Sequence, residues 1–164
     1  MPISSETHRF HITELNKLTG KTFAFFTLRT IIVHIVTYYI AGTLAYFVQW
    51  GGVYGGSAMQ TYMKAPSEFA PWVIPSQILR GIILAVALYP FLGRILELKR
   101  WGWLSVSSLY LLIGTIAGSG GIIEHIVFTT TPVFFTLATI PEIVAQGLMF
   151  GYLLVLWERR SHHT

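Results

Sequence analysis

Four long apolar stretches constrain this chain more than any other feature of its sequence. A helix that crosses a bilayer needs about 20 predominantly apolar residues, and each stretch has that length. The stretches do not alternate at period two, as the strands of a membrane barrel do. The pattern therefore predicts an all-α polytopic membrane protein, a bundle of four transmembrane helices in a domain of residues 23–157. The predicted spans cover about residues 23–50, 72–92, 103–128 and 133–157.

The composition agrees with a membrane protein and excludes several other classes. Hydrophobic residues make up 53% of the 164 residues and charged residues only 11%, against about 25% charged residues in an ordinary soluble domain. The chain contains no cysteine and no aspartate, which excludes disulfides, iron–sulfur clusters and thiol catalysis. The net charge of +4 does not indicate a nucleic-acid partner, because the basic residues do not form a patch interleaved with aromatic residues.

Lysine and arginine side chains flank the predicted spans mainly on one side. Such residues are enriched in cytoplasmic loops, so we expect residues 1–22 to form a cytoplasmic N-terminal segment and residues 158–164 a cytoplasmic tail. The external loop, residues 51–71, contains only Lys64 as a basic residue. Both termini are thus predicted to be cytoplasmic, in a multi-pass protein of a bacterial inner membrane. The basic residues of the cytoplasmic side are Arg9, Lys17, Lys21, Arg94, Lys99, Arg100, Arg159 and Arg160.

Ionisable side chains inside the predicted spans are the first candidates for a functional site. Such groups are costly in a bilayer and usually face a partner or a cavity. By helix rise, Arg80 and Glu142 lie at similar depths, about 10–14 Å below the outer surface. We expect them to pair, although Glu124 is an alternative partner for Arg80. Gln77 shares a helix face with Arg80, and Gln146 shares one with Glu142.

Further polar residues complete the predicted binding site. His34 and Tyr38 are four residues apart on the first span, and Tyr38 comes within reach of Glu142 if it faces inward. Arg29 lies close to the cytoplasmic end and can extend to the interface, so it is not assigned to the site. The predicted binding residues are Arg80, Glu142, Gln77, Gln146, Tyr38, Glu124, His125 and His34.

No cofactor and no metal is predicted, and no catalytic residue can be assigned. A haem held by two histidines would need His34 and His125 at one depth, but helix rise separates them by about 15–20 Å. The spans lack the Glu-x-x-His pairs of di-metal carboxylate proteins. The sequence also lacks the G-x-S-x-G and H-E-x-x-H motifs of common hydrolases.

Three functions are compatible with these features. The first is a small transporter or ligand-binding membrane protein with an outward-facing Arg/Glu polar site, working as an oligomer. The second is a structural or accessory subunit of a larger membrane complex, and the third is an intramembrane enzyme acting on lipid. Gly114 and Gly118 have the spacing of closely packed helices, in keeping with a homo-oligomer or a membrane protein partner. The lipid bilayer, and a lipid or small-molecule ligand, are the other expected partners.

Three short segments carry a resemblance to other proteins. They are Pro75–Gly81 together with Ala87–Pro90, Ile123–Thr129, and Pro141–Ile143. In these segments the chain resembles small bacterial four-span membrane proteins of unassigned activity. The resemblance implies no substrate, cofactor or catalytic residue.

Overall fold

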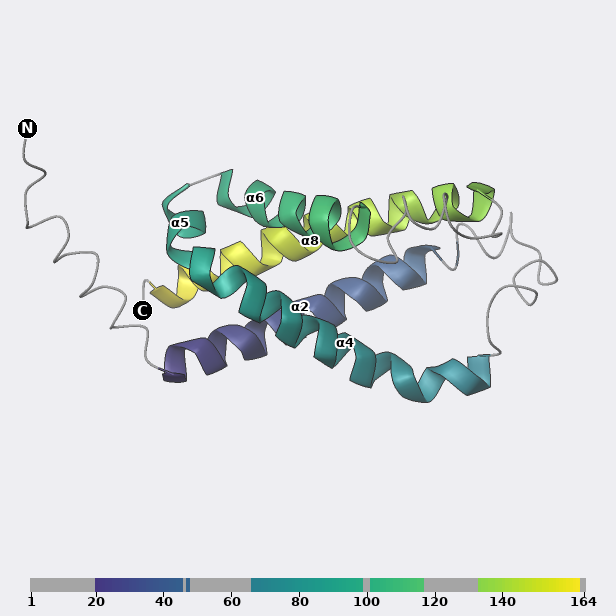
Figure 1. Ribbon diagram of the computed structural model, residues 1–164, viewed down its shortest axis with the longest axis horizontal. Helices are drawn as coiled ribbons and strands as arrows, with labels where there is room; N and C mark the ends of the chain where they lie inside the picture. Colours follow the sequence, from purple (N-terminus) through teal and green to yellow (C-terminus); the bar gives the residue numbers. More distant parts are fainter. Residues whose placement is uncertain (1–19, 46, 48–65, 99–100, 117–132, 163–164) are drawn as a thin grey trace, which may run out of the picture.

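The described part of the protein is entirely helical. The computed structural model describes residues 20–45, 47, 66–98, 101–116 and 133–162, and within these ranges it contains no strand (Figure 1). The all-α class predicted from the sequence is confirmed for these residues. Their elements are α2 (Gly20–Ala45), α4 (Pro66–Leu88), η2 (Tyr89–Phe91), α5 (Leu92–Glu97), α6 (Gly102–Ser108), η4 (Leu109–Ile116) and α8 (Val133–His162).

Three helical segments are long and apolar enough to cross a membrane. They are Thr22–Ala45, Ala70–Glu97 and Thr139–Ser161, and a shorter apolar helix covers Gly102–Leu112. By length and composition, the chain is a membrane-embedded protein. The third predicted span extends to residue 128, but residues 117–128 lie outside the described residues, as do residues 1–19 and 51–65. The count of four spans and the placement of the termini therefore stay predictions.

Proline explains how the second long helix begins and why it changes character. α4 begins at Pro66, inside the range predicted as external loop, and proline suits the first turn because its missing N–H has no partner there. Pro90 cannot donate to the carbonyl of Val86, and at this point the chain tightens into the 3-10 turn η2. It then continues as α5, so the connection to α6 is shorter than the predicted loop of residues 93–102. The Trp101 N–H donates to the Leu98 carbonyl there at 2.9 Å.

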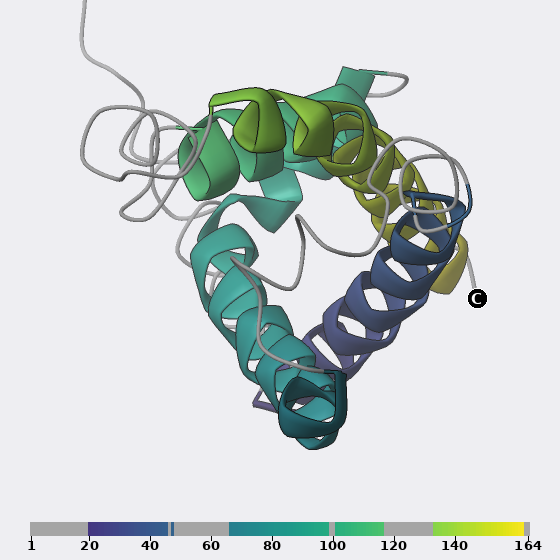
Figure 2. The same cartoon turned by 90° about the vertical axis from the view of Figure 1, so that its right-hand side faces the viewer.

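α2 lies between α4 and α8 in the described bundle. It packs against both α4 and α8, while α6 packs against α8. The view along the bundle shows α2 bridging between α4 and α8 (Figure 2). The start of α2 and the end of α8 lie at the same end of the molecule (Figure 1). α8 continues to His162, so the predicted tail from residue 158 begins as helix.

Glycines allow the helices to approach closely. A Cβ added at Gly151 would lie 2.5 Å from the Trp103 carbonyl oxygen and 2.8 Å from the Ser107 backbone nitrogen. A Cβ added at Gly147, one turn earlier, would lie 2.6 Å from Leu111 Cδ2. The two glycines have the small-xxx-small spacing of close helix pairs, and they seat α6 and η4 on α8. Close packing at Gly114 and Gly118 stays a prediction, because Gly118 lies outside the described residues.

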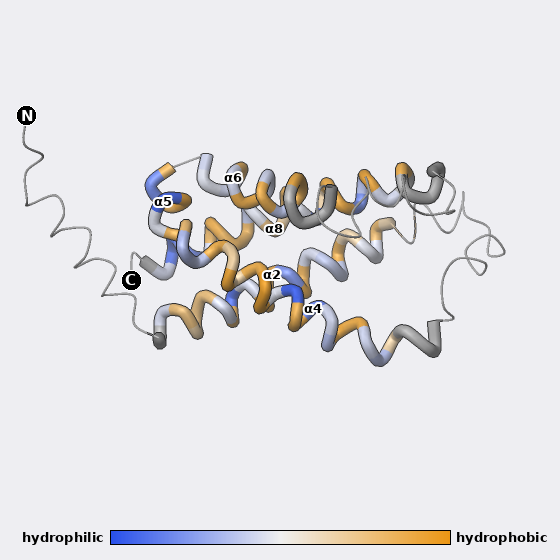
Figure 3. Tube along the Cα trace, viewed as in Figure 1, coloured by the Kyte–Doolittle hydropathy of each residue, from blue (hydrophilic) through white to orange (hydrophobic). Residues whose placement is uncertain are grey.

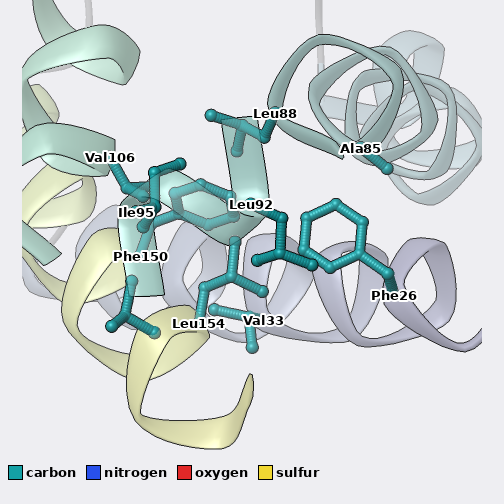
Figure 4. Close-up of a cluster of buried hydrophobic side chains, with 10 residues drawn as sticks. Phe26, Val33, Ala85, Leu88, Leu92, Ile95, Val106, Phe150 and Leu154 are labelled. Carbon is teal, nitrogen blue, oxygen red and sulfur yellow. The ribbon is translucent and has the colours of Figure 1, made fainter. Parts of the chain in front are cut away.

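Apolar side chains fill the interior and also cover the outside. A buried cluster joins α2, α4, α5, α6 and α8 (Figure 4). Large apolar side chains such as Leu28, Leu79 and Ile83 are exposed, as expected of surfaces that face lipid tails. Hydrophobic residues follow the helices along their whole length, with hydrophilic ones near α5 and where α2 passes α4 (Figure 3). The buried cluster comprises Phe26, Val33, Ala85, Leu88, Leu92, Ile95, Val106, Phe150, Leu154 and Val155.

Candidate functional site

A buried hydrogen bond between His34 and Gln77 joins α2 to α4. His34 is 1% exposed and Gln77 is 4% exposed. His34 Nε2 and Gln77 Oε1 are 2.9 Å apart. The amide nitrogen of Gln77 faces Ser76 Oγ at 3.5 Å, so the amide oxygen is turned to the histidine. In this arrangement, His34 Nε2–H donates and Gln77 accepts.

Two aromatic rings enclose the imidazole of His34. The Phe150 ring of α8 lies edge-on to it, with ring centroids 5.9 Å apart and an interplanar angle of 89°. The Tyr110 ring of η4 lies 6.0 Å from it and 5.2 Å from the Phe150 ring. η4 is π-helical. This conformation is rare in proteins, and where it occurs it is often at a functional site. All the long elements of the described bundle thus contribute to the surroundings of this histidine.

Two buried polar atoms, one on α2 and one on α8, have no hydrogen-bond partner in the described part of the chain. They are His34 Nδ1 and Gln146 Nε2. A buried polar atom without a partner costs about 1–3 kcal/mol. With Nε2–H donating to Gln77, Nδ1 of a neutral imidazole is an acceptor, whereas the Gln146 amide nitrogen is a donor. The described protein groups therefore leave one acceptor on α2 and one donor on α8 unused.

Opposite charges act on the tyrosines that flank the histidine. Glu142 is half-buried, and a Cβ added at Gly42 of α2 would lie 3.5 Å from its Oε1. The charges of Arg80 and Glu142 both act on Tyr38 and on Tyr110, which places the two charges around one region. Arg80 is exposed. The structure shows no ion pair or hydrogen bond between Arg80 and Glu142, so the direct contact predicted from their depths is absent.

The structure brings part of the predicted set together. His34 contacts Gln77 directly, and Tyr38 lies within electrostatic reach of Arg80 and Glu142. Of the two residues predicted to share a face of the second span, Gln77 is buried and Arg80 is exposed. Gln146, one turn after Glu142, is buried.

Two predicted site residues, Glu124 and His125, lie outside the described residues. The alternative pairing of Arg80 with Glu124 therefore stays a prediction. Binding by the predicted set of residues therefore stays a prediction.

Sequence reasoning missed an ion pair at the end of the bundle where α8 ends. Arg29 Nη1 donates to both carboxylate oxygens of Glu158, each at 3.1 Å. Glu158 is 2% exposed, and the pair ties α2 to α8. The usable signal was that Glu158 follows the last predicted span at the end that is predicted to be cytoplasmic, the end to which Arg29 of the first span is also close. Tyr110 and Phe150 were also missed, because apolar and aromatic residues inside a span give no sign of a polar neighbour.

The described residues do not gather the side chains that a metal site needs. No three histidine, cysteine, aspartate or glutamate side chains of the described ranges come together. No protein family, curated protein or solved structure matches this chain.

Proposed function

We propose that the chain is a small ligand-binding or transport membrane protein whose ligand occupies the polar region around His34. The observation that carries the proposal is the pair of unpartnered buried atoms, His34 Nδ1 and Gln146 Nε2. A polar network that only clasps helices together is stable when every member has a partner, because a half-satisfied network is costlier than an apolar contact. An unused donor and an unused acceptor suit a ligand that supplies the complementary groups.

The surrounding charges indicate the chemistry of that ligand. Arg80 attracts an anionic group and Glu142 a cationic one, and both charges act on Tyr38. A small polar molecule with groups of opposite charge would match this arrangement. The aromatic rings of Tyr110 and Phe150 would bound such a molecule on the side of η4 and α8. Following the predicted topology, the ligand would enter from the outer face, and an oligomer or a membrane protein partner would complete its path.

A structural or accessory role is the second candidate function. It is favoured by the His34–Gln77 hydrogen bond, which by itself is a clasp between α2 and α4. The two candidates differ in whether water reaches the polar region. A ligand site open to the aqueous phase is wet at some stage of its cycle, whereas a clasp between helices stays dry.

Cysteine accessibility separates the two functions. The chain has no cysteine, so single cysteines can be introduced without removing any. A hydrophilic, membrane-impermeant methanethiosulfonate reagent reacts with the thiolate, which forms only where water is present. We expect Tyr38→Cys and Gln146→Cys to react when the reagent is added from the outer side of intact cells, and to react more slowly from the inner side in inverted vesicles.

Matched controls come from the same helices. Ala85→Cys replaces a fully buried core residue at 0% exposure, and Leu79→Cys replaces an apolar residue that is 59% exposed at the lipid-facing surface. Neither should react, because the first is enclosed and the second faces hydrocarbon. Protection of both Tyr38→Cys and Gln146→Cys to the level of Ala85→Cys would reject the ligand site and favour the accessory role.

A further inference from the structure

An open groove runs between α2 and α8, apart from the polar region around His34. Its volume is about 490 Å³, within the range of about 300–1,000 Å³ typical of ligand sites. None of the candidate binding residues lines it. The lining residues are Ile32, Val33, Val36, Leu153, Leu156, Trp157, Arg160 and Ser161.

The groove is apolar along its length and polar at one end. Ile32 and Val36 are 39% and 43% exposed, and they face the groove together with leucines of α8. From Leu153 to Ser161, α8 rises by about 12 Å. Arg160 and Ser161 stand at the end where α8 terminates, next to Trp157. An indole at the boundary between apolar and polar surface is typical of the membrane–water interface.

Arg160 is the charged group at the polar end of the groove. It is exposed, and it forms no ion pair with any described residue. Two other arginines do form ion pairs: Arg29 is held by Glu158 at 3.1 Å, and Arg94 by Glu97 at 2.8 Å. The groove thus combines an apolar trough with one positive charge that forms no ion pair within the described part of the chain.

We propose that this groove binds an anionic phospholipid. One acyl chain lies along Ile32, Val36 and Leu153, and the phosphate group contacts the guanidinium of Arg160. The membrane boundary marked by Trp157 places the headgroup in the leaflet on the side where α8 ends. A second copy of the chain fits this surface less well. A two-fold contact joins identical patches, so it would bring two Arg160 side chains together without a described carboxylate between them.

Lipid binding can be measured on the full-length protein by native mass spectrometry from detergent. The probes are palmitoyl-oleoyl phosphatidylglycerol and palmitoyl-oleoyl phosphatidylcholine, which share their acyl chains and differ in headgroup charge. The wild-type chain should retain phosphatidylglycerol in preference to phosphatidylcholine. Arg160→Gln should lower this preference about fivefold, which corresponds to about 1 kcal/mol for one cation near an anionic headgroup. Arg94→Gln removes the same formal charge away from the groove and should leave the preference unchanged.

A variant of the trough tests the acyl-chain contact. Val36→Trp fills the groove from an exposed position and should reduce the adducts of both lipids together. Equal adducts of the two lipids on the wild-type chain, or an equal effect of Arg94→Gln and Arg160→Gln, would overturn the proposal. It would also be overturned if Val36→Trp left both lipid adducts unchanged and instead lowered the fraction of dimer in the same spectra, because the groove would then be an interface between copies.

Discussion

Two glutamates of α8 show how differently carboxylates can be accommodated within one helix. Glu158 is buried and accepts two hydrogen bonds from Arg29. Glu142 is half-buried and has no ion pair among the described residues, although it shares its surroundings with the charge of Arg80. A buried charge whose partner is removed is strongly destabilising. The stability of the bundle should therefore depend on Glu158 more than on Glu142.

We expect Glu158→Gln to lower the free energy of unfolding by about 3 kcal/mol, the lower end for a buried ion pair. The lower end applies because the Arg29 side chain keeps 24% exposure. Glu142→Gln, the matched change on the same helix, should cost less. Arg29→Met combined with Glu158→Leu should recover much of the loss, since apolar residues can replace a buried pair. Unfolding of the purified protein in mixed detergent measures all three, and equal losses for Glu158→Gln and Glu142→Gln would contradict the assignment.

Depth along a helix predicted individual residues better than it predicted their partners. His34 and Gln77 were both candidates because polar groups are rare in apolar spans, and both are buried in the described bundle. Their contact could not be predicted, because spacing within a helix fixes which residues share a face but not which helix lies opposite. The same reason explains why Arg80 and Glu142 form no direct contact. Similar depth on two helices does not bring two side chains together when α2 lies between α4 and α8.

At the scale of elements, the lengths of the apolar helices were predictable from the sequence. Local departures from α-helical geometry were not. The long helices α2 and α8 cover much of the first and last predicted spans. The π-helical segment η4 has no sequence signal, because its residues are as apolar as those of an α-helix. The packing of α6 on α8 depends on Gly147 and Gly151. The spacing of two glycines predicts close packing, but it does not predict which helix packs against them.

The contact at Gly151 gives a prediction about the α6–α8 pair. Gly151→Ala places a methyl group against the backbone of Trp103 and Ser107, and backbone atoms cannot rotate away as a side-chain end can. Overpacking of this kind costs about 1–3 kcal/mol, so the thermal midpoint of the purified protein should fall. Gly93→Ala is the control, because nothing lies within 4 Å of the added Cβ. It should leave the midpoint unchanged or raise it, as alanine favours helix. An unchanged midpoint for Gly151→Ala would show that α6 does not pack against α8 in this way.

At the scale of the whole molecule, α2 connects the separate features of the chain. Its residue His34 faces Gln77 of α4 and Phe150 of α8. Ile32 and Val36 of the same helix line the groove toward the end of α8. Arg29, about one turn earlier, holds Glu158. A change in the tilt of α2 would therefore act on the polar region, the groove and the ion pair together, so a ligand at one of them can be coupled to the others through this helix.

The number of membrane crossings decides which side of the membrane the polar region faces. The described apolar helix Gly102–Leu112 is too short to span a bilayer, which needs about 20 residues. The third predicted span, residues 103–128, can therefore cross the membrane only if its apolar residues up to 128 take part. If this span forms, basic residues collect on one side of the membrane, and Lys64 is alone on the other.

Fusions of green fluorescent protein and alkaline phosphatase after residue 164 should then report a cytoplasmic C-terminus. Insertions at Lys64 should report an external loop, and insertions at Lys99 a cytoplasmic one. An external C-terminus together with a cytoplasmic site at Lys99 would mean that only one further crossing follows Lys99, and the four-span topology would be wrong.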